Sequence, residues 1–253
     1  MKIPSALRVA SLSAAFLLAS HVSVLAQWTN DASVYPNDAL LPGEPTGNIW
    51  KGLTKVWAQR HAQWATTTGQ DDDGVVFLGD SITQGWTSLA QDFPNLKTVN
   101  RGISGDTSRG VLYRLYADVL SLKPKAIVLL IGANDIGNGG DPSAVSDNIK
   151  EILKDIRKKY PKIPVIVCEV MPSSEKMGRP AAKIEKLNKL IKHDVRWHSH
   201  TYLCDTWTIF ADAQGDAPHD IFHDLLHPNA QGYAKWKAAL DPIFAKVNIQ
   251  PVN

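Results

Sequence analysis

VVFLGDSITQGW, residues 75–86, is the stretch of this sequence that decides the fold. Four apolar residues lead directly into Gly-Asp-Ser, and a short polar turn and a tryptophan follow. A short apolar run bounded by turn residues is typical of a strand buried in a parallel sheet. Such a strand would end by presenting Ser81 at the edge of the sheet.

Four more apolar runs alternate with segments of helical periodicity. The runs are KTVNRG, AIVLLIG, PVIVCEV and TYLCD, at residues 97–102, 126–132, 164–170 and 201–205. The helical segments are about residues 50–66, 108–120, 142–160, 180–197 and 230–247. Strands that alternate with helices of this length indicate βαβ units. The sequence therefore predicts an α/β fold with a central parallel sheet of about five strands and helices on both faces.

The first 26 residues have the features of a secretory signal peptide. Lys2 and Arg8 precede an apolar stretch at residues 12–18, and Val-Leu-Ala at residues 24–26 provides a small-residue cleavage site. The apolar stretch is too short to span a bilayer. We therefore predict cleavage after Ala26 and a secreted or periplasmic protein without membrane insertion.

The mature chain divides into two parts by composition. Residues 27–49 are rich in Pro, Gly, Asn and Asp and have no period, which predicts an irregular N-terminal strap. Residues 50–253 suit a single domain. Within its first helical segment, Trp50, Trp57 and Trp64 recur every seven residues, which predicts that all three dock on the core.

Charge and cysteine content limit the partners and the chemistry. Without the signal peptide the chain has 25 basic and 25 acidic residues, which argues against nucleic acid or an anionic membrane as a partner. Cys168 and Cys204 are its cysteines. Export permits a disulfide between them, but both stand in apolar runs where buried free thiols are common, so both states remain open.

Candidate catalytic residues follow the predicted strands, where ligands bind in an open parallel sheet. A serine nucleophile needs an imidazole that takes its proton and a carboxylate that orients the imidazole, and Ser81, His227 and Asp224 can fill these roles. Negative charge on the tetrahedral oxygen needs N–H donors. The Gly105 backbone and the Asn134 amide stand where such donors are wanted. No G-x-S-x-G occurs, which argues against an ordinary α/β-hydrolase.

Four blocks in this order, GDSITQG, NRGISGDTS, GANDIG and DLLHPNAQGY, resemble those of the SGNH or GDSL-type hydrolase family over about residues 75–233. The stretch NRGISGDTSRGVLYRL, with KPKAIVLLIGAND after it, is similar to the catalytic subunits of platelet-activating-factor acetylhydrolase and their secreted bacterial relatives. The resemblance implies a three-layer, flavodoxin-like fold and no metal or organic cofactor. It also implies roles for five residues: Ser81 as nucleophile, the Ser81 N–H, Gly105 N–H and Asn134 side chain as oxyanion hole, His227 as general base and Asp224 as its partner.

Each assignment has a structural alternative. Ser81 could cap the following helix, since serine is a favoured N-cap residue. Gly105 could be a turn glycine, which is compatible with an exposed N–H. Asn134 could close its own turn by a side-chain hydrogen bond. We interpret Asp80 as structural, holding the loop after the first strand.

The last block contains two overlapping D-x-x-H units, Asp220 with His223 and Asp224 with His227. Only the second precedes PNAQGY, the tail that resembles the family, so we favour it. His219 and the other two histidines are spaced by four, as zinc ligands on one helical face could be. Pro228 argues against this site because the residue before a proline is disfavoured in helical geometry.

The predicted function is hydrolysis of a small-molecule or glycan ester with a short acyl chain, in particular O-acetyl groups on carbohydrate. One alternative is a lipase-like or lysophospholipase activity on longer chains. Another is a non-catalytic glycan-binding module on the same fold. Trp86 is a candidate for a sugar-stacking or acyl-pocket wall, or equally for a buried position.

Overall fold

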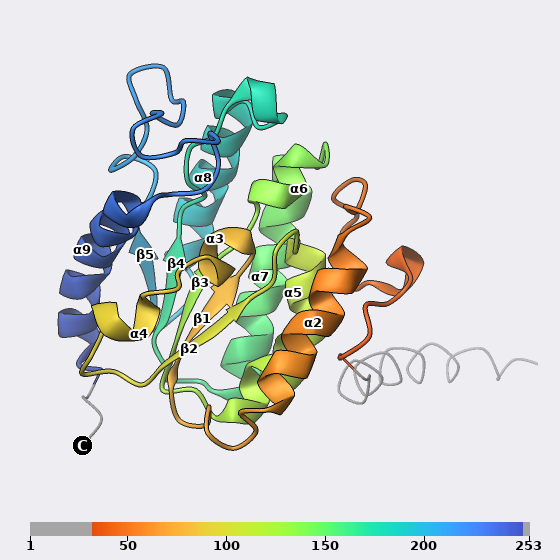
Figure 1. Cartoon of the computed structure of the whole chain (residues 1–253), viewed down its shortest axis with the longest axis vertical. Helices are drawn as coiled ribbons and strands as arrows, with labels where there is room; N and C mark the ends of the chain where they lie inside the picture. The colour runs from red at the N-terminus through yellow and green to blue at the C-terminus, as the bar shows by residue number, and fades with distance from the viewer. Residues whose placement is uncertain (1–31, 250–253) are drawn as a thin grey trace, which may run out of the picture. The chain divides into compact units, whose positions relative to one another are not determined.

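The computed structural model describes residues 32–249, and the predicted signal peptide lies outside them. Five strands pair in parallel in the order β2-β1-β3-β4-β5 (Figure 1). They are β1 (Val75–Gly79), β2 (Thr98–Gly102), β3 (Ala126–Leu130), β4 (Val165–Cys168) and β5 (Thr201–Cys204). Each lies within a predicted run, and the prediction of a five-stranded parallel sheet is confirmed.

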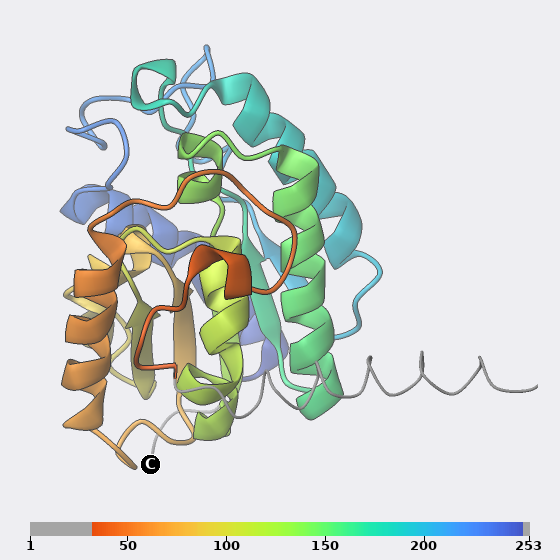
Figure 2. The same ribbon diagram turned by 90° about the vertical axis from the view of Figure 1, so that its right-hand side faces the viewer.

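Helices cover both faces of this sheet, as the views in Figures 1 and 2 show. One face carries α5, α7 and α8, with α2 beside α5, and the opposite face carries α4 and α9. The helices are α2 (Leu53–Ala65), α3 (Ser81–Gln84), α4 (Leu89–Asp92), α5 (Ser108–Asp118), α6 (Ala133–Gly137), α7 (Pro142–Lys159), α8 (Ala181–Val195) and α9 (Ala230–Val247). Single 3-10 turns form η1 (Asp38–Leu40), η2 (Leu120–Leu122) and η3 (Glu175–Met177). The result is the predicted three-layer arrangement.

The residues at the two ends of helix α7 explain where it begins and ends. Asp141 caps its start by accepting a hydrogen bond from the Ser143 N–H, and Pro142 occupies the first turn. Its last turn is basic, at residues 157–159, which suits the negative end of the helix dipole. A buried row of apolar side chains faces the sheet, so the helix is stabilised by packing as well as by its cap.

The strand order places a reversal of direction between β1 and β3. The chain leaves β1 for β2 on one side and then returns to β3 on the other. In open parallel sheets a crevice forms at such a point, at the carboxyl ends of the strands. Gly79, the last residue of β1, stands there between Gly102 of β2 and Leu130 of β3.

The N-terminal segment, here residues 32–52, crosses α5 and α7 before it enters α2 (Figure 2). The Arg109 side chain of α5 donates hydrogen bonds to backbone carbonyls at Asp38, Leu41 and Pro42. Asn148 of α7 exchanges two hydrogen bonds with the Glu44 backbone. The segment also pairs with the loop after α6 through an isolated bridge at residues 47 and 139. Its path is irregular, yet its backbone is held by both helices.

The three regularly spaced tryptophans have different environments. Trp57 is fully buried, and its indole N–H donates to the Ala32 carbonyl at 2.7 Å. Trp64 is half-buried against the same cluster. Trp50 precedes the helix, which begins at residue 53, and is 51% exposed. The prediction that Trp50 docks on the core is therefore wrong, because the chain before Leu53 is not helical and does not continue the spacing.

Cys168 and Cys204 are both free and buried. They stand opposite each other in register at the ends of β4 and β5. The free-thiol alternative is the one that the structure shows. Among the helices within residues 32–249, none is long and apolar enough to cross a membrane.

Candidate active site

Ser81 stands directly after β1, at the first position of α3. The carboxylate of Asp80 accepts a hydrogen bond from the Ile82 N–H at 2.9 Å and thereby caps this helix. The structural interpretation of Asp80 is confirmed, and Ser81 is not the N-cap residue. A β-carbon on Gly79 would lie 2.3 Å from the Leu130 carbonyl oxygen, so only glycine lets β1 approach β3 this closely.

A line of three side chains joins Ser81 to the loop before α9. His227 Nε2 lies 2.9 Å from Ser81 Oγ, and His227 Nδ1 lies 2.6 Å from Asp224 Oδ2. The other carboxylate oxygen of Asp224 accepts from the backbone N–H groups of Leu226 and His227. Burial alone would raise the pKa of Asp224, but the hydrogen bonds from His227 and Leu226 outweigh it and the pKa is lowered. Asp224 is therefore a carboxylate at neutral pH.

The alternative pair, Asp220 and His223, takes no part in this line of hydrogen bonds. The Asp220 carbonyl accepts a hydrogen bond from the Asn229 side chain, which also caps α9. The predicted zinc alternative is not supported, because nowhere in residues 32–249 do three or more His, Cys, Asp or Glu side chains gather as metal ligands could. Of the two overlapping units, the structure thus brings Asp224 and His227 to Ser81.

Gly105 lies in the tight loop after β2. Its φ of +84° belongs to the left-handed region that favours glycine. The loop is joined to β1, since the Ile103 N–H donates to the Gly79 carbonyl at 3.1 Å. A β-carbon on Gly105 would lie 2.5 Å from the indole of Trp50. Both backbone conformation and space therefore require glycine, and the exposed indole of the N-terminal segment lies against this loop.

Asn134 sits in the first turn of α6 and connects two other loops. Its Nδ2 donates to the Asp106 carbonyl at 3.0 Å, and its Oδ1 accepts from Arg179 Nη2 at 3.0 Å. The side chain is 9% exposed. These contacts are made across the sheet edge, so they differ from the local turn bond considered as the alternative for Asn134.

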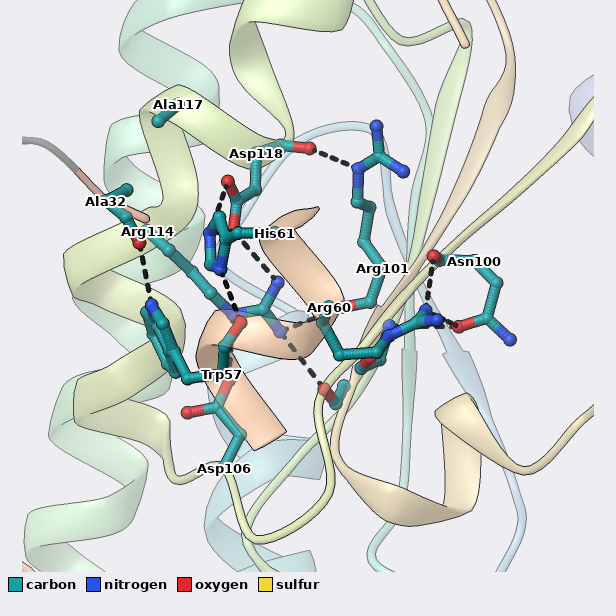
Figure 3. Close-up of polar contacts among 12 residues, drawn as sticks. Ala32, Trp57, Arg60, His61, Asn100, Arg101, Asp106, Arg114, Ala117 and Asp118 are labelled. Carbon is teal, nitrogen blue, oxygen red and sulfur yellow. Dashed lines mark hydrogen bonds and ion pairs between the residues drawn. The ribbon is translucent and has the colours of Figure 1, made fainter. Parts of the chain in front are cut away.

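Buried charges hold Asp106, which follows Gly105 in the loop after β2 (Figure 3). The Arg114 guanidinium, fully buried on α5, pairs with Asp106 at 2.8 Å. It also donates to the backbone carbonyls of Gly79 and Arg101, at 3.1 and 2.9 Å. Burial raises the pKa of Asp106 to about 7, while Arg114 acts in the opposite direction. One arginine thus ties the loop after β2 to the end of β1.

Trp86 is buried, with 1% of its surface exposed. Its indole N–H donates to Asp92 at 2.6 Å, and its ring packs against Tyr233 and Trp236, with centroids 5.3 and 4.7 Å away. The substrate-binding role considered for Trp86 is therefore corrected. An aromatic cluster under α9 encloses the ring, so it cannot stack on a sugar.

Sequence reasoning missed three residues of this region, Arg114, Arg179 and Trp50. Arg114 lies on α5 whereas Asp106 precedes that helix, so the separation of 8 residues between them is not a helical spacing that could have paired them. Arg179 reaches Asn134 from 45 residues away, and no local pattern marks it. The position of Trp50 outside the helix could have been recognised from Gly52, the N-cap residue after which α2 begins.

Comparisons with known proteins agree with this geometry. Residues 77–235 match the GDSL-like Lipase/Acylhydrolase family. The chain is 33% identical over 187 residues to platelet-activating factor acetylhydrolase IB subunit alpha2 of Homo sapiens, covering 71% of this chain and 79% of that protein. With the alpha1 subunit of Pongo abelii it shares 27% identity over 201 residues, covering 77% and 85%.

A solved structure shows the same fold. The crystal structure of a GDSL-like lipase from Bacteroides thetaiotaomicron superposes with a TM-score of 0.65 at 24% identity. The superposition covers 74% of this chain and 97% of that one.

Proposed function

Since the chain belongs to the GDSL-like lipase/acylhydrolase family, and is a carboxylic ester hydrolase, we propose that it cleaves its substrate through an acyl-enzyme on Ser81. The observation that carries this proposal is the line of hydrogen bonds from Asp224 through His227 to Ser81. It is the arrangement in which an imidazole activates a hydroxyl and a carboxylate orients the imidazole.

In the proposed reaction Ser81 Oγ attacks the ester carbonyl carbon while its proton passes to His227 Nε2. Asp224 stabilises the imidazolium. The N–H groups of Ser81 and Gly105 and the Asn134 amide donate to the tetrahedral oxyanion. The carbon–oxygen bond to the alcohol then breaks, and the alcohol leaves with the proton from His227. Water, deprotonated by His227, attacks the acyl-enzyme and releases the carboxylic acid, and Ser81 recovers its proton.

We further propose that the acyl group is short, in the first instance acetyl. The proposal is supported by the names of the relatives at 33% and 27% identity, which are acetylhydrolases. The alternative of longer acyl chains predicts rates that increase with acyl length. Both the short-chain and the long-chain specificity are forms of carboxylic ester hydrolysis, so both agree with the family. The family membership argues against a non-catalytic glycan-binding module.

For the alcohol portion we propose a carbohydrate. Trp50 supports this proposal, because a half-exposed indole lies against the Gly105 loop where the ester would be held. A pyranose ring has an apolar face that packs on a flat aromatic ring, and exposed aromatic side chains combine large contact area with little conformational freedom.

We propose that the protein is exported, on the basis of the signal-peptide features at residues 1–26. Expression of the full chain in a secreting host and mass spectrometry of the released protein should give Gln27 as the first residue. Retention of the intact chain in the cells would contradict export.

The proposed function is tested by hydrolysis of p-nitrophenyl acetate, butyrate and octanoate. We expect the acetate to be preferred, and both Ser81→Ala and His227→Ala to lose at least about 1,000-fold in kcat, because each removes a member of a unit that acts together. The matched control is His223→Ala, the histidine of the other D-x-x-H unit, which should keep full activity. Full activity in Ser81→Ala would overturn the acyl-enzyme.

A further inference from the structure

Arg179 is held in one place between two helices. It follows Gly178, which ends η3 with a φ of +69°, and precedes Pro180, the N-cap residue of α8. Its own N–H donates to the Ser174 carbonyl at 3.0 Å. The backbone that carries the side chain is thus fixed on both sides, and the guanidinium points back toward α6.

Three of the five N–H donors of this guanidinium make hydrogen bonds. Nε donates to the Ala133 carbonyl at 2.8 Å, Nη1 to the Met177 carbonyl at 2.8 Å, and Nη2 to Asn134 Oδ1 at 3.0 Å. Gly137 leaves the space that the group occupies, since a β-carbon there would lie 2.6 Å from Arg179 Cζ. The neighbouring helix is therefore shaped to receive the arginine.

The Asn134 amide has two partners, Arg179 and the Asp106 carbonyl. The chemistry of these two partners fixes which way the amide faces. An amide has an oxygen end that only accepts and a nitrogen end that only donates, and the two ends have almost the same shape. A guanidinium has donors alone, so it must face the oxygen. The Asp106 carbonyl has acceptors alone, so it must face the nitrogen. With both partners in place, a flipped amide would lose two hydrogen bonds and bring like groups together.

Only one orientation suits the proposed reaction, because an oxyanion needs an N–H and is repelled by a carbonyl oxygen. An amide nitrogen carries two hydrogens, and one of them is donated to the Asp106 carbonyl. A cation on the amide oxygen also draws electron density from the nitrogen, which makes the second N–H a stronger donor.

We propose that Arg179 is a positioning residue for ester hydrolysis, which orients and polarises the Asn134 amide so that its free N–H faces the developing oxyanion. This inference rests on the proposed function, in which Asn134 belongs to the oxyanion hole. Arg179 itself touches no reacting atom. Its contribution passes through Asn134, and that dependence can be measured.

The test is a double-mutant cycle of Arg179→Met and Asn134→Ala, with kcat and KM measured on p-nitrophenyl acetate. A donor that stabilises only the transition state affects kcat and leaves KM little changed. We expect Arg179→Met to lower kcat at least about 10-fold with KM within about twofold. In the Asn134→Ala background the same substitution should lower kcat less than about twofold, because no amide remains to be oriented.

Equal losses of kcat in the two backgrounds would overturn the role of Arg179 and leave the proposed function standing. Unchanged activity in Asn134→Ala alone would instead contradict the oxyanion hole itself. The matched control is Arg157→Met, since Arg157 also donates to backbone carbonyls from a loop-facing guanidinium, at Tyr160, Ile163 and His200, but at the opposite end of the sheet. A comparable loss of kcat in that control would assign the effect to general destabilisation and overturn the proposal.

Arg179→Lys keeps the cycle informative if the methionine variant does not fold. Lysine supplies one donor to Asn134 Oδ1 without the planar fork of arginine. We expect a smaller loss of kcat than for methionine, and again a loss of less than about twofold in the Asn134→Ala background. A loss that persists in that background would overturn the proposal.

Discussion

Asp80 and Ser81, which are neighbours at the end of β1, have different roles. The carboxylate of Asp80 holds the first turn of α3, which leaves the Ser81 hydroxyl free to meet His227. The position is costly for a charge, because Asp80 is 1% exposed. Burial raises its pKa to about 6, against the opposing effects of the Ile82 N–H and the nearby charges of His227 and Arg179.

This cost predicts how Asp80→Asn changes the pH dependence of stability. With a pKa raised from about 3.9 in the unfolded chain, Asp80 favours the folded state at low pH and loses that contribution as pH rises through 6. Asparagine keeps the cap and has no charge. We expect the free energy of unfolding of Asp80→Asn, relative to the parent protein, to rise by up to about 3 kcal/mol between pH 4 and pH 7.

Urea unfolding at both pH values measures this difference. The exposed Asp73→Asn serves as control and should show no such change. A difference between Asp80→Asn and the parent that stays constant with pH would contradict the expected titration of Asp80.

Helices and strands differ in how far the sequence predicted them. All five strands fall inside predicted runs, because contiguous apolar residues mark a buried strand even when it is short. The helix α9 has the predicted bounds of 230 and 247, because a long periodic segment buries one face along its whole length. The short helices α3, α4 and α6 were not predicted. Each has only four or five residues, too few for a period, and tertiary contacts form them.

Of the predicted catalytic residues, Ser81 stands directly after β1, while Asp224 and His227 lie in the loop before α9. The structure brings the three within hydrogen-bonding distance. The residues behind them were missed for a physical reason. Arg114 on α5 and Arg179 before α8 donate to backbone carbonyls and to the Asn134 amide oxygen. Such contacts depend on how the strands are ordered, which no local spacing records.

The N-terminal segment is predicted to contribute to substrate selection through Trp50. We expect Trp50→Ala to lower kcat/KM on an acetylated xylo-oligosaccharide about 3- to 10-fold, since an aromatic contact contributes roughly 0.5–1.5 kcal/mol beyond area burial. Hydrolysis of p-nitrophenyl acetate should change less than about twofold, because that substrate has no sugar ring.

The control for Trp50 is Trp197→Ala, a more exposed tryptophan after the end of α8. It should affect neither substrate. Equal losses on both substrates in Trp50→Ala would show instead that the indole supports the Gly105 loop.

Over the molecule as a whole, charge is buried where segments distant in the sequence meet. Arg114 joins α5 to β1 and β2 through its hydrogen bonds to their carbonyls. Its Cζ lies 5.7 Å from the ring centroid of Trp57 on α2, and its Nη1 lies 3.5 Å from Asp118 Oδ2 (Figure 3). We expect Arg114→Met to lower the free energy of unfolding by about 3–5 kcal/mol, because it leaves the Asp106 carboxylate buried without its partner.

The control for Arg114 is Lys237→Met, which breaks a surface pair with Asp241 on α9 and should cost less than about 1 kcal/mol. Urea denaturation measures both variants. A loss in Arg114→Met as small as that in Lys237→Met would mean that the buried pair contributes little to the fold.

The facing cysteines at the ends of β4 and β5 have a consequence for the opening of the sheet. In-register residues of neighbouring parallel strands project to the same side, so the two thiols are neighbours sealed beneath the surface. Burial raises the pKa of the Cys168 thiol, which leaves little reactive thiolate in the folded state. A thiol reagent can then modify these sulfurs only as fast as the structure around the ends of β4 and β5 opens. The chain thus carries two intrinsic reporters of its local unfolding, at the strand pair farthest from β2.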